Sequence, residues 1–182
     1  MELPDDIKQE IKNSFYIPLK NTDFRLSIVK PESMHLTLKF LGECDKSTID
    51  NIANDLRTHL SVYPLIHLSL GEKGYFGPRF NPRVLCLSLE GDIDKLKIVS
   101  EQIDDITSNY GFEKEKREFK PHITMARNKS RDKSIKLIEY FDTLSIPHLT
   151  FTTLSIYIKK SELKPSGAVH TNIYEIPLSK RD

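Results

Sequence analysis

The chain of 182 residues is 38% hydrophobic and 29% charged, a composition typical of an ordinary globular protein and unlike that of a disordered chain. Its formal net charge of +1 gives no basis for wrapping long nucleic acid, whereas a few local cations can still bind a compact anion. The sequence has no long apolar run, no signal peptide and no CxxC spacing between Cys44 and Cys86, which predicts a soluble cytoplasmic protein with reduced thiols.

Hydrophobic periodicity predicts helices interleaved with mostly antiparallel strands, and hence an α+β fold. Pro4, Asp5 and Asp6 open the first helix, because proline and acidic residues suit the first helical turn. A strand with His-x-Thr, a helix and further strands occur twice in that order, which indicates two similar lobes. Helices are expected at 4–15, 46–59, 92–109 and near 132–141, and strands at 24–29, 34–41, 65–70, 83–89, 119–126, 149–159 and 171–178.

Two short peptides place histidine and threonine in the same pattern, Met-His-Leu-Thr-Leu-Lys around His35 and Lys-Pro-His-Ile-Thr-Met around His122. Side chains two residues apart in a strand project from one face. His35, Thr37 and Lys39 therefore share a face, and Thr124 shares a face with His122. Because the intervening residues are apolar and suit the core, we expect the polar faces to line a groove or to meet water.

The His-x-Ser/Thr pattern is common in this chain and does not by itself identify a site. His59, His67 and His148 also carry it, and only His170 does not. His59 falls near the end of a predicted helix, where a positive charge suits the helix dipole, and His67 has no cation nearby. His148 closely mimics His122 but has no arginine five residues later, so we place these three histidines outside the site.

The paired peptides resemble the motifs of the two-histidine (2H) phosphoesterase superfamily, and more closely its RNA 2′,3′-cyclic phosphodiesterase branch, the 2′–5′ RNA ligase (LigT-like) family. Four further segments resemble parts of that family in the same order, so the similarity spans nearly the whole chain. They are the first-helix sequence Leu3–Lys8, the lead-in Lys30–Met34, the strand Phe80–Leu85 and the turn Ser161–Ala168.

The resemblance implies one two-lobed α+β domain over the whole chain, with a central cleft, one histidine from each lobe, and neither a metal nor another cofactor. It implies hydrolysis of an RNA or nucleotide 2′,3′-cyclic phosphate to a 2′-phosphomonoester. His35 would be the general acid toward the 3′ oxygen and His122 the general base. Thr37 and Thr124 would donate hydrogen bonds to phosphate oxygens, and Arg127 would contact the phosphate.

Histidine suits both proton transfers because its unperturbed pKa is about 6.5. Lys39 would add positive charge on the histidine face, or else be an edge charge in water. Arg127 has the wrong parity for the face of His122, so it must act from a strand end or a β-bulge. Tyr75 and Phe76 are candidates for stacking a base, although core packing is the commoner role of such residues.

Two departures from the family pattern stand out. Family members usually begin with a hydrophobic strand before the first helix, whereas this sequence starts at the Leu-Pro-Asp that follows it, so we expect that strand to be missing. A vacant place in a sheet leaves backbone groups unpaired, which favours strand exchange between copies. Cys86 stands where the family often has an aromatic residue, which leaves the base preference open.

Three alternatives remain at this point. The same chemistry in reverse would join RNA ends through a 2′–5′ linkage without ATP, and the substrate would be either an RNA end or a small cyclic nucleotide. A catalytically idle module that binds RNA ends is a second class, against which the retention of both histidines and both threonines argues. A histidine metal site is a third, but the carboxylate or cysteine ligands usual for such sites are lacking.

Overall fold

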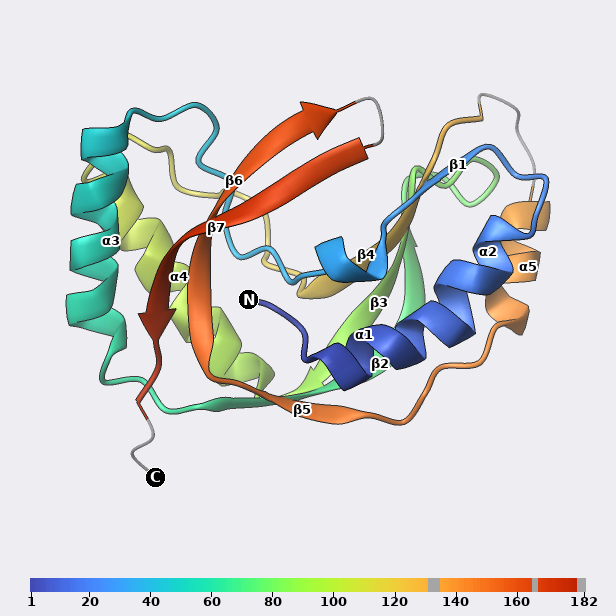
Figure 1. The fold of residues 1–182 in the computed structure, drawn as a ribbon, viewed down its shortest axis with the longest axis horizontal. Coiled ribbons are helices and arrows are strands. Elements are labelled where there is room, and N and C mark those ends of the chain that lie inside the picture. Colours follow the sequence, from blue (N-terminus) through green and yellow to red (C-terminus); the bar gives the residue numbers. More distant parts are fainter. Residues whose placement is uncertain (131–134, 165–166, 180–182) are drawn as a thin grey trace.

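The computed structural model describes residues 1–130, 135–164 and 167–179. A five-stranded antiparallel sheet, in the order β1-β4-β3-β2-β5, lies beside a two-stranded sheet of β6 and β7, with helices around both (Figure 1). The strands are β1 (Leu26–Ile28), β2 (Ile66–Phe76), β3 (Val84–Gly91), β4 (His122–Asn128), β5 (Thr150–Thr153), β6 (Ser155–Lys164) and β7 (Gly167–Pro177). The α-helices are α1 (Asp5–Ile11), α2 (Ile17–Lys20), α3 (Lys46–Leu60), α4 (Ile93–Ser108) and α5 (Lys136–Thr143).

The helices gather at the two ends of the molecule, which gives the two-lobed α+β arrangement that the sequence predicted (Figure 1). At one end α3 packs on α4 and on β7. At the other end α1 and α2 lie beside α5, where the rings of Phe15 and Phe141 are 5.7 Å apart and the hydroxyl of Tyr140 donates to the Pro18 carbonyl at 3.2 Å.

The first helix is longer than the sequence predicted, because α1 continues through a π-helical turn, Lys12–Tyr16, into α2. Pro18 has no N–H for the ordinary helical bond and its ring crowds the preceding turn, so a wider turn there keeps the helix going. The apolar stripe accordingly extends beyond the predicted end. Ile7, Ile11, Phe15 and Leu19 are all at most 1% exposed.

The two longest helices match their predicted ranges to within one residue. Asp45 caps α3, since its carboxylate accepts a hydrogen bond from the Thr48 N–H at 2.9 Å. The predicted stripe of α4 is buried at Leu96, Val99, Ile103 and Ile106. Together with the strand interiors, these faces form one apolar cluster that runs through both lobes.

Other predicted bounds were wrong. The strand expected over 34–41 is reduced to isolated pairs at His35 and Leu36, because a 3-10 turn, Pro31–Ser33, precedes it and no strand pairing follows. The strand at 65–70 continues through Phe76, past a bulge at which Gly71 leaves no room for a Cβ beside Ser88. The strand at 149–159 is divided into β5 and β6, and the part of the fourth helix expected at 132–134 lies outside the described residues.

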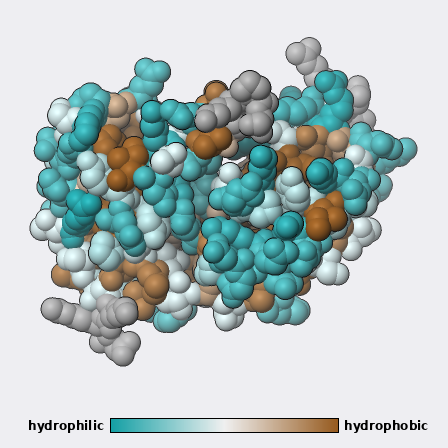
Figure 2. All heavy atoms as spheres, viewed as in Figure 1, coloured by the Kyte–Doolittle hydropathy of each residue, from teal (hydrophilic) through white to brown (hydrophobic). Residues whose placement is uncertain are grey.

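The surface seen in Figure 2 is mostly hydrophilic, with its apolar side chains in small separate patches. Among the described residues, no helix combines the length and the apolar character needed to cross a membrane.

Candidate functional site

The two His-x-Thr segments lie side by side. Leu36 pairs with Ile123 in antiparallel register, and both of these side chains are buried in the core, at most 2% exposed. Each motif histidine therefore stands opposite the threonine of the other motif, on the face turned away from the core. Cross-strand side chains in this diagonal relation lie about 7–8 Å apart, so His35 and His122 share one face at a spacing that suits a single phosphate between them.

Both imidazoles are held in the same way. His35 Nδ1 lies 2.7 Å from the Ser33 carbonyl oxygen, and His122 Nδ1 lies 2.7 Å from the Lys120 carbonyl oxygen. A carbonyl oxygen only accepts hydrogen bonds, so in each ring Nδ1 carries the hydrogen and donates it. Each neutral ring is left with a lone pair on Nε2, the atom that is free to exchange a proton with a substrate.

A β-bulge brings Arg127 to the histidine face. β4 pairs Thr124 with Cys86 but Arg127 with Val84. Cys86 and Val84 are two residues apart on β3 and share a face, so their partners share it too. The extra residue in β4 is a bulge, one of the two arrangements, a strand end or a β-bulge, that the sequence analysis allowed. Arg127 is exposed and makes no ion pair within the described part of the chain.

The two residues predicted to stack a base, Tyr75 and Phe76, lie on opposite faces of β2. Phe76 pairs with Val84 and therefore shares the face of Arg127, and its ring lies edge-on to His122 at 4.8 Å between centroids. Tyr75 pairs with Leu85 and points to the opposite face of β2. The structure thus brings only Phe76 of this pair to the histidines.

Cys86 forms part of the floor of this face, between Thr124 on one neighbouring strand and Gly74 on the other. Its side chain is buried, and burial raises the pKa of the thiol to about 11, so the sulfur is uncharged at neutral pH. A Cβ built on Gly74 would lie 3.5 Å from Cys86 Sγ. Because Cys86 and Gly74 are both small, they leave space on this face beside the ring of Phe76.

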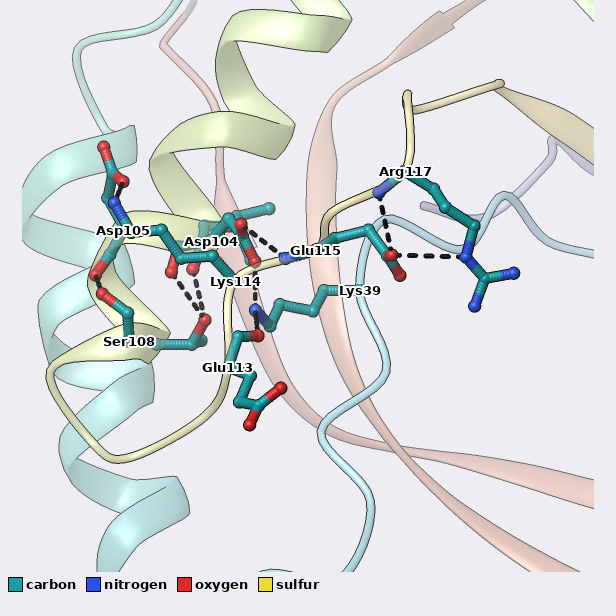
Figure 3. A network of polar contacts seen from close by, with 10 residues as sticks. Lys39, Asp104, Asp105, Ser108, Glu113, Lys114, Glu115 and Arg117 are labelled. Atoms are coloured by element: carbon teal, nitrogen blue, oxygen red, sulfur yellow. Dashed lines mark hydrogen bonds and ion pairs between the residues drawn. The ribbon is translucent and has the colours of Figure 1, made fainter.

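Lys39 points into a polar network formed by α4 and the loop that follows it (Figure 3). Its ammonium group pairs with the Asp104 carboxylate and donates to the Glu113 carbonyl oxygen at 2.9 Å, and its side chain is only 9% exposed. Asp104 also accepts the Glu115 N–H at 2.9 Å. Lys39 therefore fastens the loop after α4, and the sequence-based hypothesis that it contacts phosphate is not retained.

The first residues of the chain flank the first motif on its other side. The Met1 amino group donates to the Leu36 carbonyl at 2.8 Å, and the Leu36 N–H donates to the Met1 carbonyl at 3.0 Å. Glu2 pairs with His35 in antiparallel register. Although the motif is not part of a long strand, it is thus fixed from both sides.

Comparisons with known proteins support the resemblance to this family over most of the chain. The family model of the 2′-5′ RNA ligase superfamily matches residues 8–162. The chain belongs to this superfamily. It is 34% identical to a Thermotoga maritima protein named RNA 2′,3′-cyclic phosphodiesterase, over 93% of this chain and 90% of that protein. A Methanocaldococcus jannaschii protein of the same name is 33% identical over 96% of each chain.

Solved structures support the fold of the superfamily. E. coli LigT complexed with 3′-AMP aligns with a TM-score of 0.75, covering 98% of this chain and 94% of that one at 21% identity. A Thermus thermophilus protein aligns with a TM-score of 0.72 at 24% identity, covering 97% and 93% of the two chains. The family model and the relatives at 33–34% identity confirm the family resemblance drawn from the sequence, and these structures confirm the fold.

One site residue of this superfamily member was missed by the sequence analysis. The ring of His170, on β7, lies edge-on to His35 with centroids 4.7 Å apart. Burial lowers the pKa of His35 to about 4, against the opposing effect of the Ser33 carbonyl; nearby positive charge on His170, the Met1 amino group and Lys159 adds to the lowering. His170 lacks the His-x-Ser/Thr pattern and its strand is far along the chain, so no sequence signal pointed to it.

The other histidines lie elsewhere. His59 Nδ1 donates within its own helix, to the Asp55 carbonyl 2.7 Å away. His67 Nδ1 lies 2.9 Å from the Thr152 hydroxyl. His148 is exposed and precedes β5, an edge strand that pairs with β2 and not with β4. Across residues 1–130, 135–164 and 167–179, no three His, Cys, Asp or Glu side chains come close enough to hold a metal ion.

Proposed function

We propose that this chain hydrolyses 2′,3′-cyclic phosphates of RNA ends or nucleotides to 2′-phosphomonoesters, with His35 and His122 as the general acid-base pair and without a metal. The observation that carries the proposal is the pairing of Leu36 with Ile123, which sets the two histidines on one face. The names of the relatives, RNA 2′,3′-cyclic phosphodiesterase, supply the substrate class.

The reaction needs one proton removed and one proton delivered. Neutral His122 accepts a proton from the attacking water on Nε2, and protonated His35 gives a proton to the departing 3′ oxygen of the ribose. The P–O3′ bond breaks as the bond from the water oxygen to phosphorus forms, so the phosphate stays on the 2′ oxygen. The fixed Nδ1 bonds keep both Nε2 atoms available for these transfers.

The acid role of His35 depends on the substrate. In the unliganded protein burial favours its neutral form, since it lowers the pKa to about 4. The cyclic phosphate carries one negative charge, and a negative charge beside an imidazole favours the protonated form. Substrate binding thus raises the fraction of His35 that carries the proton needed by the leaving oxygen.

The remaining groups on this face stabilise charge on the phosphate. The hydroxyls of Thr37 and Thr124 make no hydrogen bond within the described residues, so both are free to donate to non-bridging oxygens. Donors aimed at developing negative charge act most strongly in the transition state. Arg127 supplies the positive charge, and its exposed position favours binding of the substrate over the chemical step.

The same site also supports a second candidate reaction, the joining of RNA ends through a 2′–5′ linkage, because it is the reverse of the same chemistry and the matching family model carries the ligase name. Incubating the protein with a 2′,3′-cyclic mononucleotide and, separately, with an RNA ending in a 2′,3′-cyclic phosphate and a 5′-hydroxyl acceptor separates hydrolysis from joining. We expect hydrolysis of both substrates and little joined RNA at micromolar RNA.

The deciding experiment is product analysis from a 2′,3′-cyclic nucleotide in the presence of EDTA. We expect a 2′-phosphate at an unchanged rate, and losses of about 10² to 10⁴-fold in His35→Ala and His122→Ala. His59→Ala is the matched control and should keep full activity. Retained binding without turnover in the wild-type protein would instead indicate an idle module that binds RNA ends, and loss of activity on chelation would indicate a metal.

A further inference from the structure

The β6–β7 hairpin contributes a third imidazole to the histidine face. The rings of His170 and His35 meet edge-on, with centroids 4.7 Å apart and an interplanar angle of 69°. In the register of the hairpin, Ser161 lies opposite His170 and Lys159 lies opposite Asn172. Residues 170 and 172 are two apart, so their side chains leave β7 on the same face, toward the first motif.

A set of hydrogen bonds fixes this face of the hairpin against the segment beside His35. Lys159 Nζ donates to Glu2 Oε1 at 2.6 Å and to Asn172 Oδ1 at 2.7 Å, and Asn172 Nδ2 donates to Glu2 Oε1 at 3.1 Å. Glu2 is the backbone partner of His35. The hairpin is thus tied to the immediate neighbour of the histidine, and His170 comes to lie on the imidazole ring as a consequence.

We propose that His170 is a positioning residue, which covers one side of the His35 ring, fixes its plane and keeps water from that side. This deepens the proposed function, because it assigns a role in preparing one member of the His35–His122 pair. An edge-on ring contact restricts rotation about the bond that carries the imidazole. With Nδ1 held by the Ser33 carbonyl and the plane of the ring fixed, Nε2 of His35 would keep one direction for proton transfer.

The charged groups around His35 come from the same hairpin and from the start of the chain. The groups that act on His35 from the packed elements are Lys159 on β6, His170 on β7 and the Met1 amino group beside the motif, and Glu2 neutralises Lys159 by direct pairing. Burial is the largest cause of the low pKa of His35. Removing the ring of His170 would admit water and return that pKa toward its ordinary value.

The test compares three variants. His170→Phe keeps an aromatic ring of similar shape but no nitrogen, His170→Ala removes the ring, and Thr171→Ala changes the exposed neighbour on the other face of β7. The pKa of His35 is measured by the NMR titration of its ring protons, and kcat and KM are measured with a 2′,3′-cyclic nucleotide. His170→Gln, which keeps most of the volume without a ring, replaces His170→Ala if the latter does not fold.

We expect His170→Ala to raise the pKa of His35 by about one unit or more and to lower kcat on the order of tenfold, with KM nearly unchanged. His170→Phe and Thr171→Ala should resemble the wild type in both measurements. An unchanged titration of His35 in folded His170→Ala would overturn the proposal, and so would a His170→Phe variant as impaired as His170→Ala, which would mean that the imidazole nitrogen acts on the substrate. A wild type that titrates as expected but hydrolyses no cyclic nucleotide would contradict the proposed function alone.

Discussion

The two histidine motifs share their local geometry and differ in their surroundings. Both rings donate from Nδ1 to the carbonyl two residues earlier, and each meets another ring edge-on at nearly the same distance. His122 lies in a strand of the five-stranded sheet and meets Phe76, which carries no charge. His35 lies in an isolated pair and meets His170, near Lys159. A repeated motif therefore sets up two similarly held imidazoles, and the surroundings of His35 lower its pKa, so its acid role depends on the negative charge of the bound phosphate.

A change of leaving group gives the sharpest test of the different roles proposed for His35 and His122. With a cyclic nucleotide, His35→Ala and His122→Ala should each lose about 10² to 10⁴-fold in kcat/KM. A 4-nitrophenyl phosphodiester releases a stable anion that needs no proton. On that substrate His35→Ala should approach the wild-type rate, while His122→Ala stays impaired. If His122→Ala is the variant that recovers, the acid and base are exchanged between the motifs.

Substitutions of Thr37 and Thr124 test whether the two motifs contribute equally to stabilising negative charge on the phosphate oxygens. Thr37→Val and Thr124→Val keep the shape of the side chain and remove its donor, so each should lower kcat by about 10²-fold with a smaller change in KM. Steady-state kinetics on a cyclic nucleotide measures both constants. Thr171→Val on β7 is the control for a change from threonine to valine away from the site. A large loss of kcat in one variant and none in the other would show that only one of the two motifs binds the phosphate oxygens.

The burial of His35 also predicts a pH dependence of stability. The pKa of His35 is lowered to about 4 in the folded protein, from an ordinary value of about 6.5. Between these values the unfolded chain binds more protons at this residue, so the free energy of unfolding falls as the pH is lowered through this window. The contribution of His35 between pH 7 and pH 4.5 is on the order of 2 kcal/mol.

Urea unfolding of the wild type and of His35→Gln at these two pH values measures this difference. The variant cannot take up the proton at residue 35, so its stability should fall less than that of the wild type between pH 7 and pH 4.5. Parallel losses in the two proteins would mean that the His35 ring is solvated in the folded state. His67→Gln, an exposed histidine on β2, serves as the matched control.

The smallest effect concerns Lys39, which the sequence analysis had placed with the phosphate-binding residues. Lys39→Met should lower the free energy of unfolding by about 1–2 kcal/mol, because it leaves the partly buried Asp104 carboxylate without its ammonium partner. The value of KM for a cyclic nucleotide should stay within about twofold of the wild type. By contrast, Arg127→Met should raise KM by about tenfold, since a charge-assisted contact to phosphate is lost. An equal rise in KM for Lys39→Met would instead support the hypothesis that Lys39 contacts the phosphate.

Sequence periodicity was sufficient for the bounds of the two longest helices and for the burial of the apolar residues in both motifs. The ranges of α3 and α4 and the apolar backs of both motifs follow from burial of one face, which is a local pattern. That Arg127 needs a strand end or a β-bulge to reach the histidine face also followed from sequence, because alternation fixes the parity of a regular strand; the structure has the bulge.

Tertiary structure decided which polar side chains meet. Lys39 has the parity of His35, yet its segment leaves the paired region and its ammonium group finds Asp104, 65 residues away. Tyr75 and Phe76 are neighbours in one strand and so lie on opposite faces, and the bulge earlier in β2 decides that Phe76 is the one on the face of His122. The contact of His170 with His35 depends on how a separate hairpin docks beside Glu2. Local sequence fixes the direction of a side chain along its own element, whereas its partner depends on long-range packing that no short pattern records.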